Sequence, residues 1–183
     1  MTAEEMLNKI DHTQLKAYAT WDDVKKLCDE AIRYHTASVC VPPSYIKAIR
    51  EAYGERLTIC TVVGFPLGYS VTEAKAAETE CALRDGCDEI DMVVNIGDVK
   101  NGRYEKVESE IRAIKEACGN HILKVIIETC YLTREEKMEM LLGNAPIAVS
   151  FYIDNAGEEE PELITRTFEE NMPKGMKVGQ YFE

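Results

Sequence analysis

Short apolar runs alternate with segments of helical periodicity along most of the 183-residue chain. The runs are rich in Val and Ile, and several are apolar on both faces, which is typical of parallel strands covered by helices. The pattern predicts six strands, each followed by a helical segment. These strands are Lys9–Leu15, Ala37–Val41, Leu57–Phe65, Glu89–Ile96, Leu123–Cys130 and Ile147–Ile153.

Three of the helical segments open with a capping box, in which Ser or Thr is followed three residues later by an acidic residue. The pairs are Thr20 with Asp23, Ser70 with Glu73 and Thr133 with Glu136. Glycines close the helical stripes near Gly86, Gly119 and Gly143. A last helix is expected from Pro161.

Alternating strands and helices predict an α/β fold with a parallel sheet. A doubly wound sheet and a barrel share this period, but no Gly-x-Gly-x-x-Gly fingerprint follows the first strand. We therefore expect residues 1–183 to form a single domain, an incomplete TIM-type (β/α) barrel with about six to seven of the usual eight strands. Its open apolar edges would need cover, so we expect a homo-oligomer.

Composition excludes several functional classes. The formal charge of −12, without a basic cluster, argues against nucleic-acid binding. No apolar stretch approaches the roughly eighteen residues of a membrane span, and the N-terminus lacks signal-peptide features, so we expect a soluble, cytoplasmic protein. The seven cysteines form no Cys-x-x-Cys pair, which predicts reduced thiols, and the three histidines are isolated, which predicts no structural metal. We also expect no metal in the site and no cofactor.

Asp91 and Lys124 are the strongest candidates for catalytic chemistry. Asp91 lies in an apolar strand, where an unpaired polar group costs about 2–7 kcal/mol, and Val93 and Asn95 should share its face. Lys124 could meet Asp91 across neighbouring strands. A partly desolvated lysine can serve as an amine nucleophile or base, whereas a buried ion pair that only satisfies both groups is an equally good interpretation.

Three further features each have a functional and a purely structural interpretation. Asp11 could orient a water or hydroxyl in a substrate site, or could cap the end of its strand. Cys40 could line a pocket or serve as a small buried apolar residue. The turn 64–68 could present backbone N–H groups to an anion, although a plain turn between strand and helix is commoner. His12 has no supporting partner and is left out of the site.

Five ordered motifs between residues 8 and 140 resemble the deoxyribose-phosphate aldolases. They are Ile10–Lys16, Ser38–Pro42, Thr61–Gly68, Glu89–Asn95 and Lys124–Thr129. The resemblance implies a (β/α)₈ barrel that cleaves 2-deoxyribose 5-phosphate to acetaldehyde and glyceraldehyde 3-phosphate through a lysine Schiff base, without metal. It also implies that Asp91 relays protons and that Lys124, Asp11 and Cys40 line the substrate pocket.

The resemblance changes after about residue 140. The family's Schiff-base lysine belongs in a Tyr-Ile-Lys-Thr-Ser motif, where this sequence places Asp154 after Tyr152 and Ile153. A carboxylate cannot form an imine. Gly179 stands where a second active-site lysine is expected, and the sequence ends at Glu183, before the expected phosphate-binding loops.

These observations predict an aldolase-family protein, weakly active or inactive, whose ligand is a small phosphorylated sugar or an aldehyde. Two alternatives remain open. Lys124 could have been recruited as the amine nucleophile, or the chain could be a non-catalytic phosphosugar-binding or partner subunit that docks on a complete barrel.

Overall fold

The structure is a computed structural model that describes residues 6–142. Its five strands are β1 (Asp11–Thr13), β2 (Ser38–Val41), β3 (Ile59–Val63), β4 (Glu89–Val93) and β5 (Ile122–Ile126). Its helices are α2 (Trp21–Tyr34), α3 (Ile46–Tyr53), α4 (Thr72–Arg84), α5 (Ile96–Lys100), α6 (Tyr104–Cys118) and α7 (Arg134–Leu142), with 3₁₀ turns η1 (Pro43–Tyr45), η2 (Gly54–Arg56) and η3 (Thr129–Tyr131). The predicted strand Ile147–Ile153 and the helix from Pro161 lie outside the described residues.

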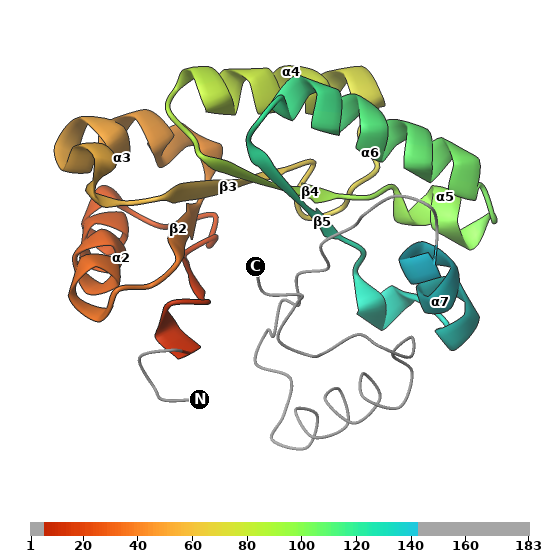
Figure 1. Cartoon of the computed structure of the whole chain (residues 1–183), viewed down its shortest axis with the longest axis horizontal. Coiled ribbons are helices and arrows are strands. Elements are labelled where there is room, and N and C mark those ends of the chain that lie inside the picture. The colour runs from red at the N-terminus through yellow and green to blue at the C-terminus, as the bar shows by residue number, and fades with distance from the viewer. Residues whose placement is uncertain (1–5, 143–183) are drawn as a thin grey trace.

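The strand order distinguishes the two predicted fold types. Each strand pairs in parallel with the next one along the chain, in the order β1-β2-β3-β4-β5. Helices α2, α3, α4 and α6 form an arc along one side of the strands (Figure 1). A doubly wound sheet would reverse its direction and place helices on both faces. The predicted barrel-type arrangement is therefore confirmed over the described residues.

Side-chain alternation divides the strands between two environments. Residues that face the helices form the main core, where Val39, Ile59 and Ile90 are fully buried among residues such as Val24 and Ile114. The alternate strand positions, which face away from the helices, form a small separate cluster that consists of Cys40, Cys60 and Val62, with Leu15 packed against it. This concave face is also where charged strand residues can gather without entering the main core. No helix among residues 6–142 is both long and apolar enough to cross a membrane.

Two of the three predicted capping boxes are confirmed. The Thr20 backbone N–H donates to Asp23 Oδ2 at 2.8 Å, and the Asp23 N–H donates to Thr20 Oγ1 at 3.3 Å. The same reciprocal pair joins Thr133 and Glu136 at 2.7 and 3.2 Å. Both boxes satisfy N–H groups that the first turn of a helix leaves without intrahelical partners.

The third predicted box, Ser70 with Glu73, is wrong. Helix α4 has Val71 as its N-cap, one residue later than predicted, and no side chain caps its first turn. The preceding turn is packed tightly against the end of β4 at Gly68, which has a φ of +68°. A Cβ atom at Gly68 would lie 1.9 Å from the Val94 carbonyl oxygen. Tertiary packing, rather than the local cap, therefore sets the path of the chain into α4.

A buried ion pair, which the sequence patterns did not reveal, joins α4, α6 and the end of β4. The Lys75 side chain is 0% exposed, and its Nζ lies 3.0 Å from Glu110 Oε1. The same ammonium donates to the Val93 carbonyl oxygen at 2.8 Å, while Glu110 Oε2 accepts from the Asn95 N–H at 3.3 Å. The strand that carries Asp91 is thus held at its carboxyl end by charged side chains from two helices.

Replacing Lys75 with Met should destabilise the fold by about 3–5 kcal/mol, because it leaves the buried Glu110 carboxylate without a counter-charge. Urea unfolding followed by circular dichroism would measure the loss. The matched control is Lys75→Met with Glu110→Leu, which removes both charges and should recover most of the stability. A single variant within about 1 kcal/mol of the wild type would show that the pair is not energetically coupled to the fold.

Candidate active site

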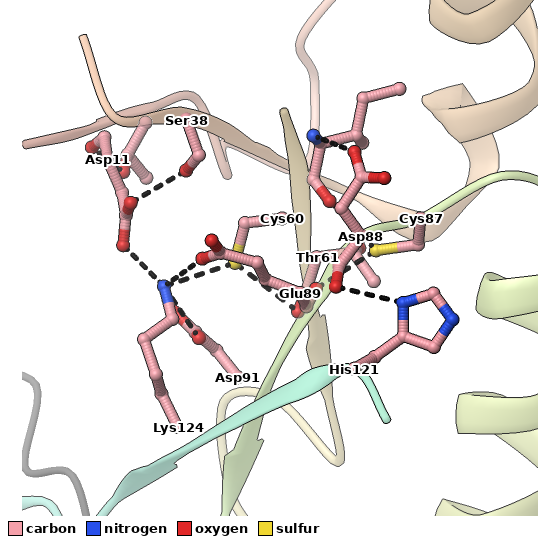
Figure 2. A network of polar contacts seen from close by, with 12 residues as sticks. Asp11, Ser38, Cys60, Thr61, Cys87, Asp88, Glu89, Asp91, His121 and Lys124 are labelled. Atoms are coloured by element: carbon pink, nitrogen blue, oxygen red, sulfur yellow. Dashed lines mark hydrogen bonds and ion pairs between the residues drawn. The ribbon is translucent and has the colours of Figure 1, made fainter. Parts of the chain in front are cut away.

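Lys124 lies at the centre of a polar cluster on the concave face of the sheet (Figure 2). Its Nζ is 2.5 Å from Asp11 Oδ2, 3.1 Å from Asp91 Oδ1 and 3.2 Å from Glu89 Oε2. Only 14% of the lysine side chain is exposed. Three carboxylates therefore surround one largely buried ammonium.

The contact between Lys124 and Asp11 shows how strongly the sheet curls. Lys124 belongs to β5 and Asp11 to β1, the two outermost strands of the described sheet. In a flat sheet, strands four spacings apart would lie about 19 Å from each other. Contact across that interval requires the sheet to curve so that its concave face becomes an interior, as in a (β/α) barrel.

Strand register explains why the other two carboxylates reach the same ammonium. Asp91 and Lys124 are direct partners in the pairing of β4 with β5, as the sequence predicted they could be. Glu89 lies two residues before Asp91 and therefore points to the same face. Sequence analysis did not select Glu89, although the same period-two argument that linked Asp91 to its face would have found it.

Asp11 is bound on both sides. Its Oδ1 accepts a hydrogen bond from Ser38 Oγ at 2.7 Å, and its Oδ2 accepts from Lys124. The carboxylate thus orients the lysine. Its neighbour His12 points to the helical face, where its Nε2 lies 2.9 Å from Glu30 Oε2, consistent with its omission from the site.

Cys60, a residue that sequence analysis missed, links the predicted Cys40 to the cluster. Lys124 Nζ lies 3.5 Å from Cys60 Sγ, and Cys40 is the direct partner of Cys60 in the pairing of β2 with β3. A hydrogen bond with Cys40, together with burial, raises the pKa of the Cys60 thiol well above its ordinary value. A single cysteine in a mostly apolar strand carries no periodic signal that separates it from ordinary core residues.

The prediction for Asn95 is wrong, whereas the turn 64–68 takes the commoner of its two interpretations. Asn95 does not extend the face of Asp91, because β4 ends at Val93 and the Asn95 side chain caps α5 by accepting from the Asp98 N–H at 3.3 Å. In the turn 64–68, the Gly64 N–H donates to Glu78 and the Gly68 N–H donates to Gly64. Because these two amides are engaged internally, the geometry favours a plain turn over an anion site.

Burial and charge act together on the proton affinities of the cluster. Burial raises the pKa of Asp91 and that of Glu89, with the Lys124 ammonium opposing the shift in each case. Burial by itself would lower the pKa of Lys124, but the neighbouring Cys60 sulfur and the Asp91 and Asp11 carboxylates outweigh it, so the pKa lies above its ordinary value.

The charges around Lys124 favour the second of the two interpretations, the buried ion pair, over a free amine. An amine must lose its proton before it can attack a carbonyl, and the surrounding carboxylates favour the ammonium. Three carboxylates and one ammonium would also carry a net charge of −2 if all were ionised, which favours a proton shared within the group. The arrangement is therefore suited to holding and transferring a proton, rather than to nucleophilic attack by Lys124.

Replacing Lys124 with Met should destabilise the protein more at pH 8 than at pH 5. Without the ammonium, the folded-state pKa values of Asp91 and Glu89 rise further above those of the unfolded chain. Stability relative to the wild type is then largely kept at low pH and lost as the pH rises through the folded-state values.

Urea midpoints of both proteins at the two pH values provide the measurement. The control is Lys26→Met, which removes an exposed lysine 3.9 Å from Glu30 and should change stability by less than about 1 kcal/mol at either pH. Equal losses for Lys124→Met at pH 5 and pH 8 would contradict the electrostatic explanation.

Known proteins of one family match this chain in sequence. Residues 5–157 match the profile of DeoC/LacD family aldolases. A deoxyribose-phosphate aldolase of Clostridium botulinum (strain Alaska E43 / Type E3) is 65% identical over 140 residues, which cover 76% of this chain and 63% of the relative. One from Streptococcus pyogenes serotype M4 is 53% identical over the same coverage. The chain thus matches just under two thirds of the length of these relatives.

Solved structures agree with the sequence matches. A crystal structure from Coccidioides immitis, described as a candidate deoxyribose-phosphate aldolase, has a TM-score of 0.71 and 38% identity over 74% of this chain and 54% of that chain. A tetrameric deoxyribose phosphate aldolase from Aeropyrum pernix has a TM-score of 0.64 and 28% identity over 73% and 56% of the respective chains. These neighbours are TIM-type barrels, the same class as the five βα units described above. The chain therefore belongs to the DeoC/LacD family of aldolases.

Proposed function

We propose that this chain binds a small phosphorylated sugar or aldehyde of the deoxyribose-phosphate aldolase type, and that by itself it is weakly active or inactive in carbon–carbon cleavage. The observation that carries the proposal is the position of Lys124, whose Nζ lies within reach of the Asp11, Glu89 and Asp91 carboxylates. This cluster supplies acid–base chemistry, whereas imine formation also requires a neutral amine.

Asp91 is the group that we assign to proton transfer. It is 6% exposed, and burial raises its pKa, so it can accept and release a proton closer to neutral pH than an exposed aspartate. Lys124 returns that proton or hydrogen-bonds a substrate oxygen, and Asp11 holds the lysine in position. Cys40 would contribute to the wall of the same cavity.

The weak activity follows from two separate observations. The sequence has Asp154 where the resemblance to the family places the imine-forming lysine. At Lys124, the neighbouring Cys60 sulfur and carboxylates outweigh the effect of burial and raise the pKa, which favours the ammonium. Neither position then provides a neutral amine, and the family reaction, cleavage of 2-deoxyribose 5-phosphate to acetaldehyde and glyceraldehyde 3-phosphate, lacks its covalent step.

We expect the chain to act in the cytoplasm and to self-associate, as the tetrameric Aeropyrum pernix protein does. The alternative, a non-catalytic phosphosugar-binding or partner subunit, shares the binding step but requires contact with a complete barrel. Pull-down with a full-length relative would test that alternative directly.

Reductive trapping should leave Lys124 unmodified, because a protonated lysine does not add to an aldehyde. The full chain is incubated with acetaldehyde and borohydride, digested, and mapped by mass spectrometry. The Clostridium botulinum relative, treated in parallel, serves as the control for the trapping chemistry. A stoichiometric two-carbon adduct on Lys124 would contradict the proposal and support recruitment of this lysine as the nucleophile.

Calorimetry should detect 2-deoxyribose 5-phosphate binding to the wild-type chain, and Asp91→Asn should weaken it because the cluster contacts the ligand. Cys81→Ser, which changes an exposed residue on α4, is the control and should bind as the wild type does. A coupled assay for glyceraldehyde 3-phosphate measures turnover in the same samples. Absence of wild-type binding would overturn the binding assignment, and turnover equal to that of the full-length relative would overturn the claim of weak activity.

A further inference from the structure

Cys40, Cys60 and Asp91 converge on the concave face from three successive strands. Cys40 on β2 and Cys60 on β3 are direct partners in the parallel pairing, and Asp91 on β4 is the partner of Val62, two residues beyond Cys60. One sulfur from each cysteine and one carboxylate oxygen all lie within 4.8 Å of one another. Residues far apart in the sequence thus present two sulfur donors and one oxygen donor to a common point.

The three side chains form a buried site. Cys60 is fully buried, and Cys40 and Asp91 are 3% and 6% exposed. Asp91 Oδ1 is shielded from solvent and makes no hydrogen bond to any residue between 6 and 142, although it lies 3.1 Å from the Lys124 ammonium. A buried carboxylate oxygen beside two thiols has the donor chemistry of a soft or borderline metal ion.

We propose that Cys40, Cys60 and Asp91 form a binding site for a thiophilic divalent cation such as Zn²⁺ or Cd²⁺. On binding, both thiols lose their protons to solvent, and the metal gains two sulfur bonds and one oxygen bond, with a fourth position left open. Tetrahedral coordination brings such donors to about 3.5–3.8 Å from one another, so the three groups need only a small inward movement. This proposal does not depend on the proposed function.

The Lys124 ammonium competes with the metal at this point. Its Nζ lies 3.5 Å from Cys60 Sγ and 3.1 Å from Asp91 Oδ1, so a cation between these groups would repel it. The lysine keeps its contacts with Asp11 and Glu89 when the metal takes Asp91. A bound metal therefore separates the two residues assigned to proton transfer, and we expect it to inhibit any reaction that uses both.

A second grouping of possible ligands on the same face is less suitable. Asp11, Cys60 and Glu89 also lie close together, but the Lys124 ammonium contacts all three of them directly. A metal at that point would have to displace the lysine from its whole environment. In the first grouping the lysine contacts Cys60 and Asp91, and no contact with Cys40 is found among the described residues, so a metal there displaces it from fewer of its partners.

Cadmium titration of the full chain tests the site. The background is Cys81→Ser with Cys130→Ser, which removes the two exposed thiols, and a phosphine reductant keeps the others reduced. We expect one equivalent of Cd²⁺ per chain with an ultraviolet thiolate-to-cadmium band. Loss of a residue that only supports a metal ligand typically weakens binding by roughly 10–100-fold. Because Cys40 and Cys60 would bind the metal directly, Cys40→Ser or Cys60→Ser should each weaken Cd²⁺ binding by more than that. Asp91→Asn should weaken Cd²⁺ binding by about tenfold or more.

The titration has a matched control, and a second measurement identifies the metal ligands without further substitutions. Cys118→Ser removes a thiol that is equally buried, in α6, and should leave the titration unchanged. X-ray absorption of the Zn²⁺ form in the same background should show two sulfur ligands, even if the Cys40 or Cys60 variants fail to fold. One sulfur or none, or loss of all metal uptake once the exposed thiols are removed, would overturn the proposal.

Discussion

The hydrogen bond from Lys124 to Asp11 crosses the concave face of the sheet and depends on the curvature of all five described strands. It joins the first strand to the fifth, so it forms only when the intervening strands curve around a common axis. The same contact sets the chemistry of the site, because it fixes the ammonium beside Glu89 and Asp91. Barrel curvature thus brings the charges together, and their arrangement in turn sets the proton affinities of the site.

The strand that carries Asp91 is supported from both faces. On the concave side its carboxylate faces Lys124, and on the helical side Lys75 and Glu110 hold the Val93 carbonyl and the Asn95 amide. Each buried ion pair bears a desolvation cost, which its mutual attraction and hydrogen bonds offset only when the geometry is good. Both pairs contact β4 or the residues that directly follow it.

The concave face combines acid–base groups with thiols, and this combination constrains what the site can do. Carboxylates around a lysine stabilise its charged form and so favour proton transfer over covalent attack. Two sulfurs beside the same carboxylate give the site an affinity for soft cations that a purely carboxylate cluster would lack. Binding of such an ion and acid–base chemistry use the same Asp91, so they exclude each other.

The sequence by itself determined the features that depend on near neighbours in the chain. The capping box at Thr20, the five strands over residues 6–142 and the family motifs all rest on interactions or patterns that span a few residues. The sequence pattern misplaced the start of α4, which has Val71 and not Ser70 as its N-cap and follows a turn packed closely at Gly68. Only the tertiary structure decided the pairing of Lys75 with Glu110 and the raised pKa of Lys124, because proton affinity depends on charges that are close in space, wherever they lie in the chain.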